Sequence, residues 1–497
     1  MNATATNPDP TELTPEEMEQ GRRQMIREGV ASQSMESFTT GIFLVGIALH
    51  FNASNLVIGI LGSIPFLSNL FQIPAIHWVE KSRDRRKIVV VTSLIARSFL
   101  LCVALTPLIK NDNLALTVII AGMAIRYSIG AMSSCAWNSW IRDLMPKQRA
   151  GEFIGSRLFY RASAATCLSI FSAFFIDWWG KEFPDIKAFS YSVLFFLGYV
   201  AGMISTYMIK KIPHPEMSKP EAKEYDKSVR FSYLKKPLKH KNFRELLIFL
   251  CIWNFATNLA APFFVVYMLK TLGYDMVFVI IITLISQVMH TFTLKLWGRY
   301  SDLYSNKTVL KISGTLFVFC IFGWTFTTFP EKHFLTTPLL VILHILMGIS
   351  TAGVTLSSGN IALKLAPRAE ATSFLAVKSI LISLAAGIAP LVGGLFADFF
   401  EDKTLSIDFN WHAGKDNVLF QTLSIQHWDF FFLLAFLIGL YSLRRLVYVQ
   451  EDGVVKHKEA MRGMMIDTTR ALKSMSSVAG LRDACMYPMK MMVGKYK

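Results

Sequence analysis

Long apolar segments separated by short polar ones run through almost the whole chain. A bilayer core about 30 Å thick is crossed by roughly 20 apolar residues in helical conformation. Segments of about that length are found at 33–51, 56–78, 88–109, 114–140, 153–176, 189–209, 246–268, 276–297, 308–329, 335–358, 372–397 and 427–448. The sequence therefore predicts an all-α integral membrane protein with twelve transmembrane helices.

The basic residues predict the orientation of these helices. The gaps that share a side with both termini hold 35 Lys and Arg, whereas the six opposite gaps hold 7. Basic residues are enriched in cytoplasmic loops. We therefore expect an inner or plasma membrane protein with both termini in the cytoplasm and the 398–426 loop outside. Residues 1–32 contain no cleavable signal, so the first span is expected to direct insertion.

Composition excludes several classes of protein. With 53% hydrophobic and 17% charged residues, the chain is too apolar for a soluble multidomain enzyme. The net charge of +16 follows the alternation of the loops, which favours contact with anionic membrane lipids and excludes nucleic acid as a partner. The inter-span loops contain no nucleophile elbow, metal-ligand cluster or phosphate loop, so we expect neither an enzyme nor a cofactor.

The chain divides into two halves of six spans. Residues 210–245 hold eleven Lys or Arg and four Pro, a composition typical of a linker. A segment is repeated on its two sides: Pro146, Phe153 and Arg157 have the same spacing as Pro367, Phe374 and Lys378. We expect a cytoplasmic tail at 1–32, two pseudo-symmetric six-helix bundles at 33–209 and 246–448, a cytoplasmic linker at 210–245, and a basic, Met-rich cytoplasmic tail at 449–497.

The loop after the eighth span resembles the signature of the major facilitator superfamily of secondary transporters, G-x-x-x-D-[RK]-x-G-x-[RK]-[RK]. Gly298, Asp302 and Lys307 match this signature, whereas Leu303 and Ser305 replace a basic residue and a glycine. The loop after the second span is a weaker copy, in which Lys81, Arg85 and Arg86 match while Glu80 and Arg83 depart from the pattern. Arg126 and Gly130 resemble the R-x-x-x-G of the family's fourth helix.

This resemblance covers the chain between its two tails, and it implies the major facilitator fold and alternating access between two bundles. It also implies that the loop acids Glu80 and Asp302, with Arg85, Gly298 and Lys307, are gating residues that latch the outward-facing state. Drug–proton antiporters of this family carry a G-P-x-x-G-G element in helix 5. Span 5 of this chain lacks that element, which argues against multidrug export. A similar run, which contains Pro390 and Gly394, lies in span 11 instead.

Ionisable residues within a span are costly and point to function. Seven of them fall at similar depth, namely Glu36, Arg97, Arg126, Arg157, Arg161, His290 and Lys378. Glu36 is the only acid deep in a predicted span, whereas Asp177, Asp398 and Asp429 lie near outer ends. The pattern predicts a cationic cavity in which Arg97, Arg126, Arg161 and Lys378 bind an anionic or zwitterionic solute. If Glu36 lies near Arg126, its proton affinity would depend on what fills the site.

Polar residues of the second half can complete the site. Asn254 and Asn258 in span 7, with Gln287 and His290 in span 8, have helical spacing. Each of these assignments has a structural alternative. Arg157 and Lys378 can extend to the membrane surface, Arg126 can form a structural ion pair, and the amides and His290 can join helices.

These observations predict a secondary active transporter, functioning as a monomer, that moves a small organic anion or zwitterion together with a proton. Two alternatives remain open. One is an exporter of amphipathic compounds such as drugs or siderophores, suggested by the 39 Phe residues. The other is a transporter-derived receptor or lipid scramblase without ion coupling.

Overall fold

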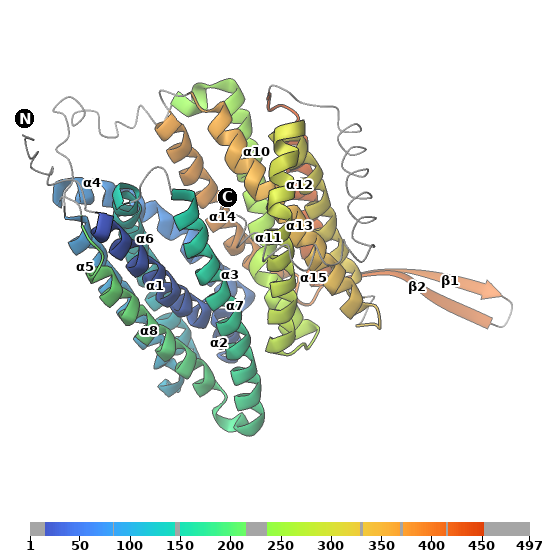
Figure 1. The fold of residues 1–497 in the computed structure, drawn as a ribbon. Coiled ribbons are helices and arrows are strands. Elements are labelled where there is room, and N and C mark those ends of the chain that lie inside the picture. The colour runs from blue at the N-terminus through green and yellow to red at the C-terminus, as the bar shows by residue number, and fades with distance from the viewer. Residues whose placement is uncertain are drawn as a thin grey trace, which may run out of the picture.

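A computed structural model describes residues 15–82, 84–144, 150–214, 236–328, 332–367, 371–413 and 416–451. The described part consists of helices and one two-stranded sheet (Figure 1). The first half contains α1 (Pro15–Thr39), α2 (Ile42–His50), α3 (Asn55–Ser68), η1 (Asn69–Phe71), α4 (Gln72–Ser82), α5 (Arg85–Ala104), η2 (Thr106–Leu108), α6 (Asp112–Leu144), α7 (Ala150–Glu182), η3 (Pro184–Ile186) and α8 (Ala188–Lys210). The second half contains α10 (Lys241–Val266), η5 (Tyr267–Thr271), α11 (Met276–Tyr304), α12 (Asn306–Gly323), η6 (Trp324–Phe326), α13 (Thr336–Leu365), α14 (Ala371–Phe399), β1 (Thr404–Ala413), β2 (Asp416–Gln426) and α15 (Trp428–Leu446).

Ten helical segments of the described chain are long and apolar enough to cross a membrane. They overlap the second to eleventh predicted spans in order, so the all-helical membrane fold is confirmed. The last predicted span corresponds to α15. The first predicted span is divided between α1 and α2 at Gly41, whose φ of 59° lies in the left-handed region that favours glycine.

Helix α1 begins much earlier than the predicted first span. It starts at Pro15, inside the segment that the sequence predicts to be a tail. The part of α1 before residue 33 buries Met25, Glu28 and Gly29. Because this buried face carries charged and small residues, hydropathy alone does not distinguish it from a polar tail.

The two halves meet mainly through α3, α7, α11 and α14, with smaller contacts of α10 to α2 and α3 (Figure 1). The most extensive contact joins α3 to α14, and glycines permit it. A Cβ at Gly59 would collide with the carbonyl oxygen of Pro390, and one at Gly394 would lie 2.5 Å from the carbonyl oxygen of Asn55. The halves are therefore in backbone contact along these helices.

Hydrogen bonds between the halves are found at one end of the bundle. There the first turn of α3 meets the last turn of α14, and the first turn of α11 meets the end of α7. We call this the closed end; it includes the loops 51–54 and 273–275. Helix α4, which continues α3 toward the opposite end, has its main contacts with α5, α6 and η1 of its own half. We call that opposite end, where α1 and α10 begin, the open end.

Strands β1 and β2 form an antiparallel ribbon that extends away from the helices (Figure 1). The ribbon follows the closed-end terminus of α14, and its register shifts between Ile407 and Asp408. It occupies most of the 398–426 loop, for which the sequence predicts an outer location.

Candidate functional site

A polar cavity of about 560 Å³ lies within the first half. Its lining comes from α1, α3, η1, α5, α6, α7 and α8, and it includes six charged residues: Glu28, Glu36, Arg97, Arg126, Arg157 and Arg161. The sequence predicts that five of these charges lie at one depth, and the structure places those five around one space. Glu28 is the sixth, and it lies in the segment that the sequence assigns to the tail.

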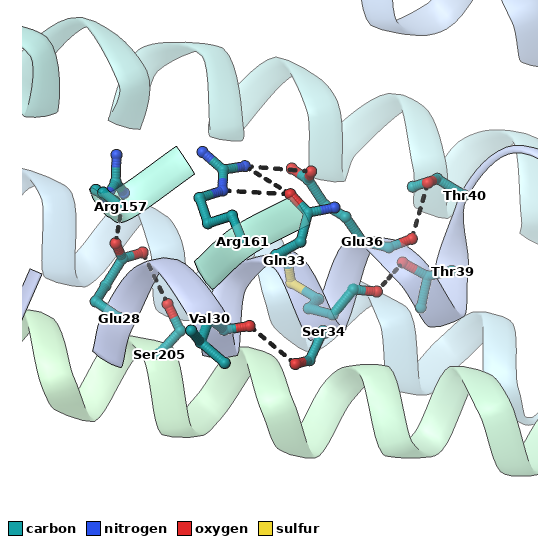
Figure 2. Close-up of polar contacts among 11 residues, drawn as sticks. Glu28, Val30, Gln33, Ser34, Glu36, Thr39, Thr40, Arg157, Arg161 and Ser205 are labelled. Atoms are coloured by element: carbon teal, nitrogen blue, oxygen red, sulfur yellow. Dashed lines mark hydrogen bonds and ion pairs between the residues drawn. The ribbon is translucent and has the colours of Figure 1, made fainter. Parts of the chain in front are cut away.

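Glu28 forms a buried ion pair with Arg157 (Figure 2). Nη2 of Arg157 lies 2.8 Å from Oε2 of Glu28, and the two side chains are 18% and 5% exposed. Oε1 of Glu28 accepts a hydrogen bond from the Ser205 hydroxyl at 3.1 Å. Nε of Arg157 donates to the carbonyl oxygen of Met25 at 3.2 Å. This pair holds α1 against α7 and α8, and its charges compensate each other.

Arg161 lies one turn further along α7 and faces Gln33 and Glu36 (Figure 2). Its Nη2 donates to the side-chain oxygen of Gln33 at 2.9 Å, and the same nitrogen lies 3.8 Å from Oε2 of Glu36. The side chain of Glu36 is 44% exposed. Glu36 is therefore paired loosely with Arg161, and not with Arg126 as the sequence hypothesis envisages.

Arg97 is buried, and its hydrogen bonds lie within the bundle. Nη1 donates to the carbonyl oxygen of Gly202 at 2.8 Å and to the Thr206 hydroxyl at 2.6 Å. These contacts join α5 to α8. Arg97 thus adds positive charge to the cavity wall while its guanidinium is held by the protein.

Arg126 differs from the other three arginines. Its side chain is only 6% exposed, and Nη1 has no hydrogen-bond partner in the described part of the chain. Its guanidinium carbon lies 4.7 Å from the centre of the Tyr127 ring, which provides a cation–π contact but no negative charge. A buried guanidinium with an unused donor is costly unless a ligand or water completes it.

Hydroxyl and amide groups line the space around these charges. They come from Asn69, Ser93, Ser133, Ser134 and Asn138. If all charged side chains are ionised, four arginines face two glutamates and the wall carries an excess of positive charge. The cavity therefore favours a small solute that bears a negative group and can form several hydrogen bonds.

The predicted residues of the second half do not line this cavity. These residues are Asn254, Asn258, Gln287, His290 and Lys378. In two of them the side-chain amide donates to a carbonyl oxygen of its own helix. Asn254 donates to the Leu250 carbonyl and Asn258 to the Asn254 carbonyl, both at 2.8 Å. The ammonium group of Lys378 lies 3.3 Å from the Ser358 carbonyl oxygen. In this conformation the charged site belongs to the first half.

The predicted gating residues have different surroundings. Asp302 is exposed and shares a surface cleft with Gly298, and it has no hydrogen-bond partner among the described residues. Arg85 is buried, with 1% exposure. The side chain of Glu80 lies outside the described part of the structure.

Lys307 belongs to a clamp at the open end of the second half. Its ammonium group donates to the carbonyl oxygens of Val447 and Val449, at 2.9 and 2.6 Å. The buried carboxylate of Glu451 accepts from the Lys307 backbone at 2.7 Å, from the Asn306 amide at 2.9 Å and from the Lys364 ammonium at 3.1 Å. Burial raises the pKa of Glu451, but these hydrogen bonds outweigh burial and lower the pKa overall.

Sequence reasoning missed Glu28, Gln33 and Ser205 as neighbours of the arginines. The run Thr14-Pro15-Glu16-Glu17 contains a signal that could have found the first of these. A capping residue, a proline and two acids are typical of the first turn of a helix, so this run predicts a helix that begins at Pro15. Glu28 would then lie two turns before Glu36 on a similar face.

Comparison with known proteins identifies the fold. The family model described as Major Facilitator Superfamily matches residues 29–335 and 291–478. No curated protein matches the sequence. Among solved structures, the nucleoside transporter NupG is 14% identical with a TM-score of 0.61, and the match covers 86% of this chain and 98% of NupG.

Two further structures show the same architecture. The inward-open xylose transporter XylE from E. coli is 13% identical with a TM-score of 0.57, covering 90% of this chain and 98% of XylE. A bacterial homologue of the human lysosomal transporter Spinster, inward-facing and unoccupied, is 13% identical with a TM-score of 0.55, covering 88% and 95%. At such identities the similarity concerns the fold alone.

Proposed function

The chain belongs to the major facilitator superfamily, and from that premise we propose that it moves a small organic anion or zwitterion by alternating access. Membership makes it a multi-span secondary transporter that binds a small-molecule substrate, and not an enzyme. The proposal adds the charge of the solute, the residue that binds it and the ion that accompanies it.

Arg126 carries the proposal for the charge of the solute. Three of the four cavity arginines bond to protein oxygens, whereas Arg126 is buried with an unused donor and forms no ion pair with an acid among the described residues. A carboxylate or phosphate group that enters the cavity would provide the missing acceptor, and charge-assisted bonds of this kind are the strong ones. The neighbouring hydroxyl and amide groups would bind the rest of the solute.

Glu36 is the proposed proton carrier. It lines the same cavity, it is partly exposed, and its nearest cation, Arg161, is shared with Gln33. An incoming anion would compete for the positive charge of Arg161 and so favour protonation of Glu36. Proton and solute would then be bound together at one site.

The state of the molecule follows from its orientation. If the basic loops are cytoplasmic, the closed end faces outward and the conformation is inward-facing. In this state Asp302 is exposed, which supports a gating role in which it finds a partner only when the open end closes.

A ligand-stability screen tests the charge of the solute. We would measure the melting temperature of the purified protein with acetate, succinate, phosphate, glycine and tetramethylammonium. A ligand that binds only the folded state stabilises it by about 2.7 kcal/mol at a hundred times its Kd. We expect an anionic or zwitterionic probe to raise the melting temperature of the wild type, to raise it less in Arg126→Lys, and to have no effect in Arg126→Ala.

Arg244→Ala is the matched control, because Arg244 is an exposed arginine at the open end of α10, outside the cavity. This variant should respond as the wild type does. Stabilisation by tetramethylammonium alone would exclude the anion site and favour an exporter of cationic or amphipathic compounds. An undiminished anion response in Arg126→Ala would exclude Arg126 as the residue that binds the anion.

A further inference from the structure

Asp398, at the end of α14, caps a helix of the other half. One carboxylate oxygen accepts from the backbone N–H of Asn55 at 2.9 Å, and the other accepts from that of Leu56 at 3.0 Å. These N–H groups are in the first turn of α3, where a helix has no internal acceptors for them. The hydroxyl of Ser54, the N-cap residue of α3, accepts from the backbone N–H of Val57 at 3.3 Å. Asp398 of the second half therefore completes the N-terminus of a first-half helix.

Asp177, at the end of α7, has the same role in the opposite direction. Its Oδ2 accepts from the backbone N–H of Val277 at 3.0 Å, in the first turn of α11. Asp275 is the N-cap residue of α11, but its side chain makes no capping hydrogen bond. The first turn of α11 thus takes its cap from a carboxylate of the first half.

The two contacts are related by the internal repeat of the sequence. Asp177 and Asp398 are 221 residues apart, as are Leu56 and Val277 and the repeat prolines Pro146 and Pro367. Each aspartate also follows its repeat proline by 31 residues. The carboxylates and the N–H groups that they accept from are therefore at equivalent positions of the two halves.

We propose that Asp177 and Asp398 are a symmetric pair of latches that hold the closed end shut. Each latch joins the two halves by a charge-assisted hydrogen bond to a helix N-terminus, where a negative group is favoured. Neither bond can persist when the halves separate at this end, because donor and acceptor belong to different bundles. Both latches must open once in every transport cycle.

The latches concern how the transporter moves, and they are independent of which solute or ion it carries. Hydrogen bonds to a charged group are stronger than those between neutral groups. Loss of one latch should therefore shift the ratio of the two conformations by at least about tenfold toward the state that is open at this end.

Distances between spin labels measure this shift without any substrate. The six native cysteines would be replaced, and labels placed at exposed positions: Asn113 and Phe334 at the closed end, and Lys87 and Lys239 at the open end. In Asp398→Ala and in Asp177→Ala we expect a longer distance to become populated between the closed-end labels and a shorter one between the open-end labels. Asp→Asn at either site should give a smaller shift, because the amide oxygen still accepts one hydrogen bond.

Asp112→Ala is the matched control. Asp112 is an aspartate at the closed end that accepts from Asn52 of its own half, at 3.0 Å. Its loss should leave both distance distributions unchanged. The latch proposal would be overturned if the distance distributions of Asp177→Ala, Asp398→Ala and the double variant all equal that of the wild type. This outcome does not depend on whether the proposed anion site is correct.

A double-mutant cycle tests the bond itself. Proline has no N–H and is tolerated in the first turn of a helix, so Val277→Pro removes one of the two backbone donors to Asp177, leaving that of Met276, and keeps α11. Val277→Pro should shift the distances in the same direction as Asp177→Ala but by less, because the Met276 N–H still donates, and adding it to Asp177→Ala should change nothing further. Strictly additive shifts would mean that Asp177 does not act through this N–H group, and elution as a single monodisperse peak would confirm that each variant is folded.

Discussion

The four arginines of the cavity differ in whether their charge is already balanced. Arg157 has a buried carboxylate at 2.8 Å, Arg161 has a shared amide and a more distant carboxylate, and Arg97 has neutral oxygens. Arg126 has an aromatic ring and an unused donor. Because Arg126 has the fewest polar partners of the four, we expect it to be the first to bind an anionic ligand. This ranking depends on side-chain contacts that no sequence pattern specifies.

The Glu28–Arg157 pair should be a stabilising contact of the bundle. Removing one partner of a buried ion pair costs about 3 kcal/mol, because the other charge stays buried without compensation. We expect Glu28→Gln to lower the melting temperature strongly, and Glu28→Gln with Arg157→Gln to recover part of the loss. Glu19→Gln is the control: Glu19 lies on the same helix, 2.8 Å from Arg22, but both side chains are 41% exposed. Equal losses in Glu28→Gln and Glu19→Gln would contradict a special role of the buried pair.

Glu36→Gln should separate solute movement from proton movement. Glutamine has a similar shape to glutamic acid but does not exchange a proton, so the site would stay permanently in its neutral form. We expect the variant to retain exchange of solute across proteoliposome membranes and to lose accumulation driven by a pH gradient. The measurement compares counterflow with gradient-driven uptake in the same vesicles. Full gradient-driven uptake would move the coupling elsewhere, with His290 as the next residue to test.

At the scale of elements, the sequence predicts the apolar helices well and the polar ones poorly. Ten spans are recovered because their length and hydropathy are imposed by the bilayer. The first half of α1 was missed because its buried face presents Glu28 and Gly29. The ribbon of β1 and β2 was also missed, since no such constraint acts on a loop outside the bilayer. The helix break at Gly41 depends on a local φ angle that hydropathy does not register.

The clamp around Glu451 ties the end of α15 to the first turn of α12 and to α13. Because the folded protein lowers the pKa of this carboxylate, its contribution to stability is complete above its ordinary pKa near 4.5 and is lost as the pH falls through the lowered value. We expect Glu451→Gln to have a lower melting temperature than the wild type at pH 7. This gap in melting temperature should narrow near pH 4. Exposed Glu401, with Glu401→Gln, is the control and should show no such gap at either pH. A gap that widens on acidification would contradict the sign of this shift.

At the scale of the whole molecule, the repeat is visible in the sequence but its mechanical use is not. The spacing of Pro146, Phe153 and Arg157 recurs in the second half and predicts two similar bundles. Asp177 and Asp398 each meet a helix of the opposite half. These contacts depend on which ends of the two bundles touch, and the repeat alone does not specify that. The polar residues of α10 and α11 do not line the cavity in this conformation. Which of them face it depends on how the two halves are arranged, and helical spacing does not specify that arrangement.

The orientation of the bundle decides which transport state this conformation represents. The excess of basic residues predicts that Lys87 and Lys239 face the cytoplasm and that Asn113 and Phe334 face outward. We expect an impermeant thiol reagent, applied to intact cells, to label single cysteines at 113 and 334 but not at 87 and 239, and to label all four after the membrane is opened. The four substitutions lie at exposed positions, so none of them should disturb folding. Labelling of all four after the membrane is opened checks that each site can react. Labelling of positions 87 and 239 from outside would show that the orientation is opposite to the predicted one. The conformation would then be outward-facing, and the two aspartate latches would close the cytoplasmic side.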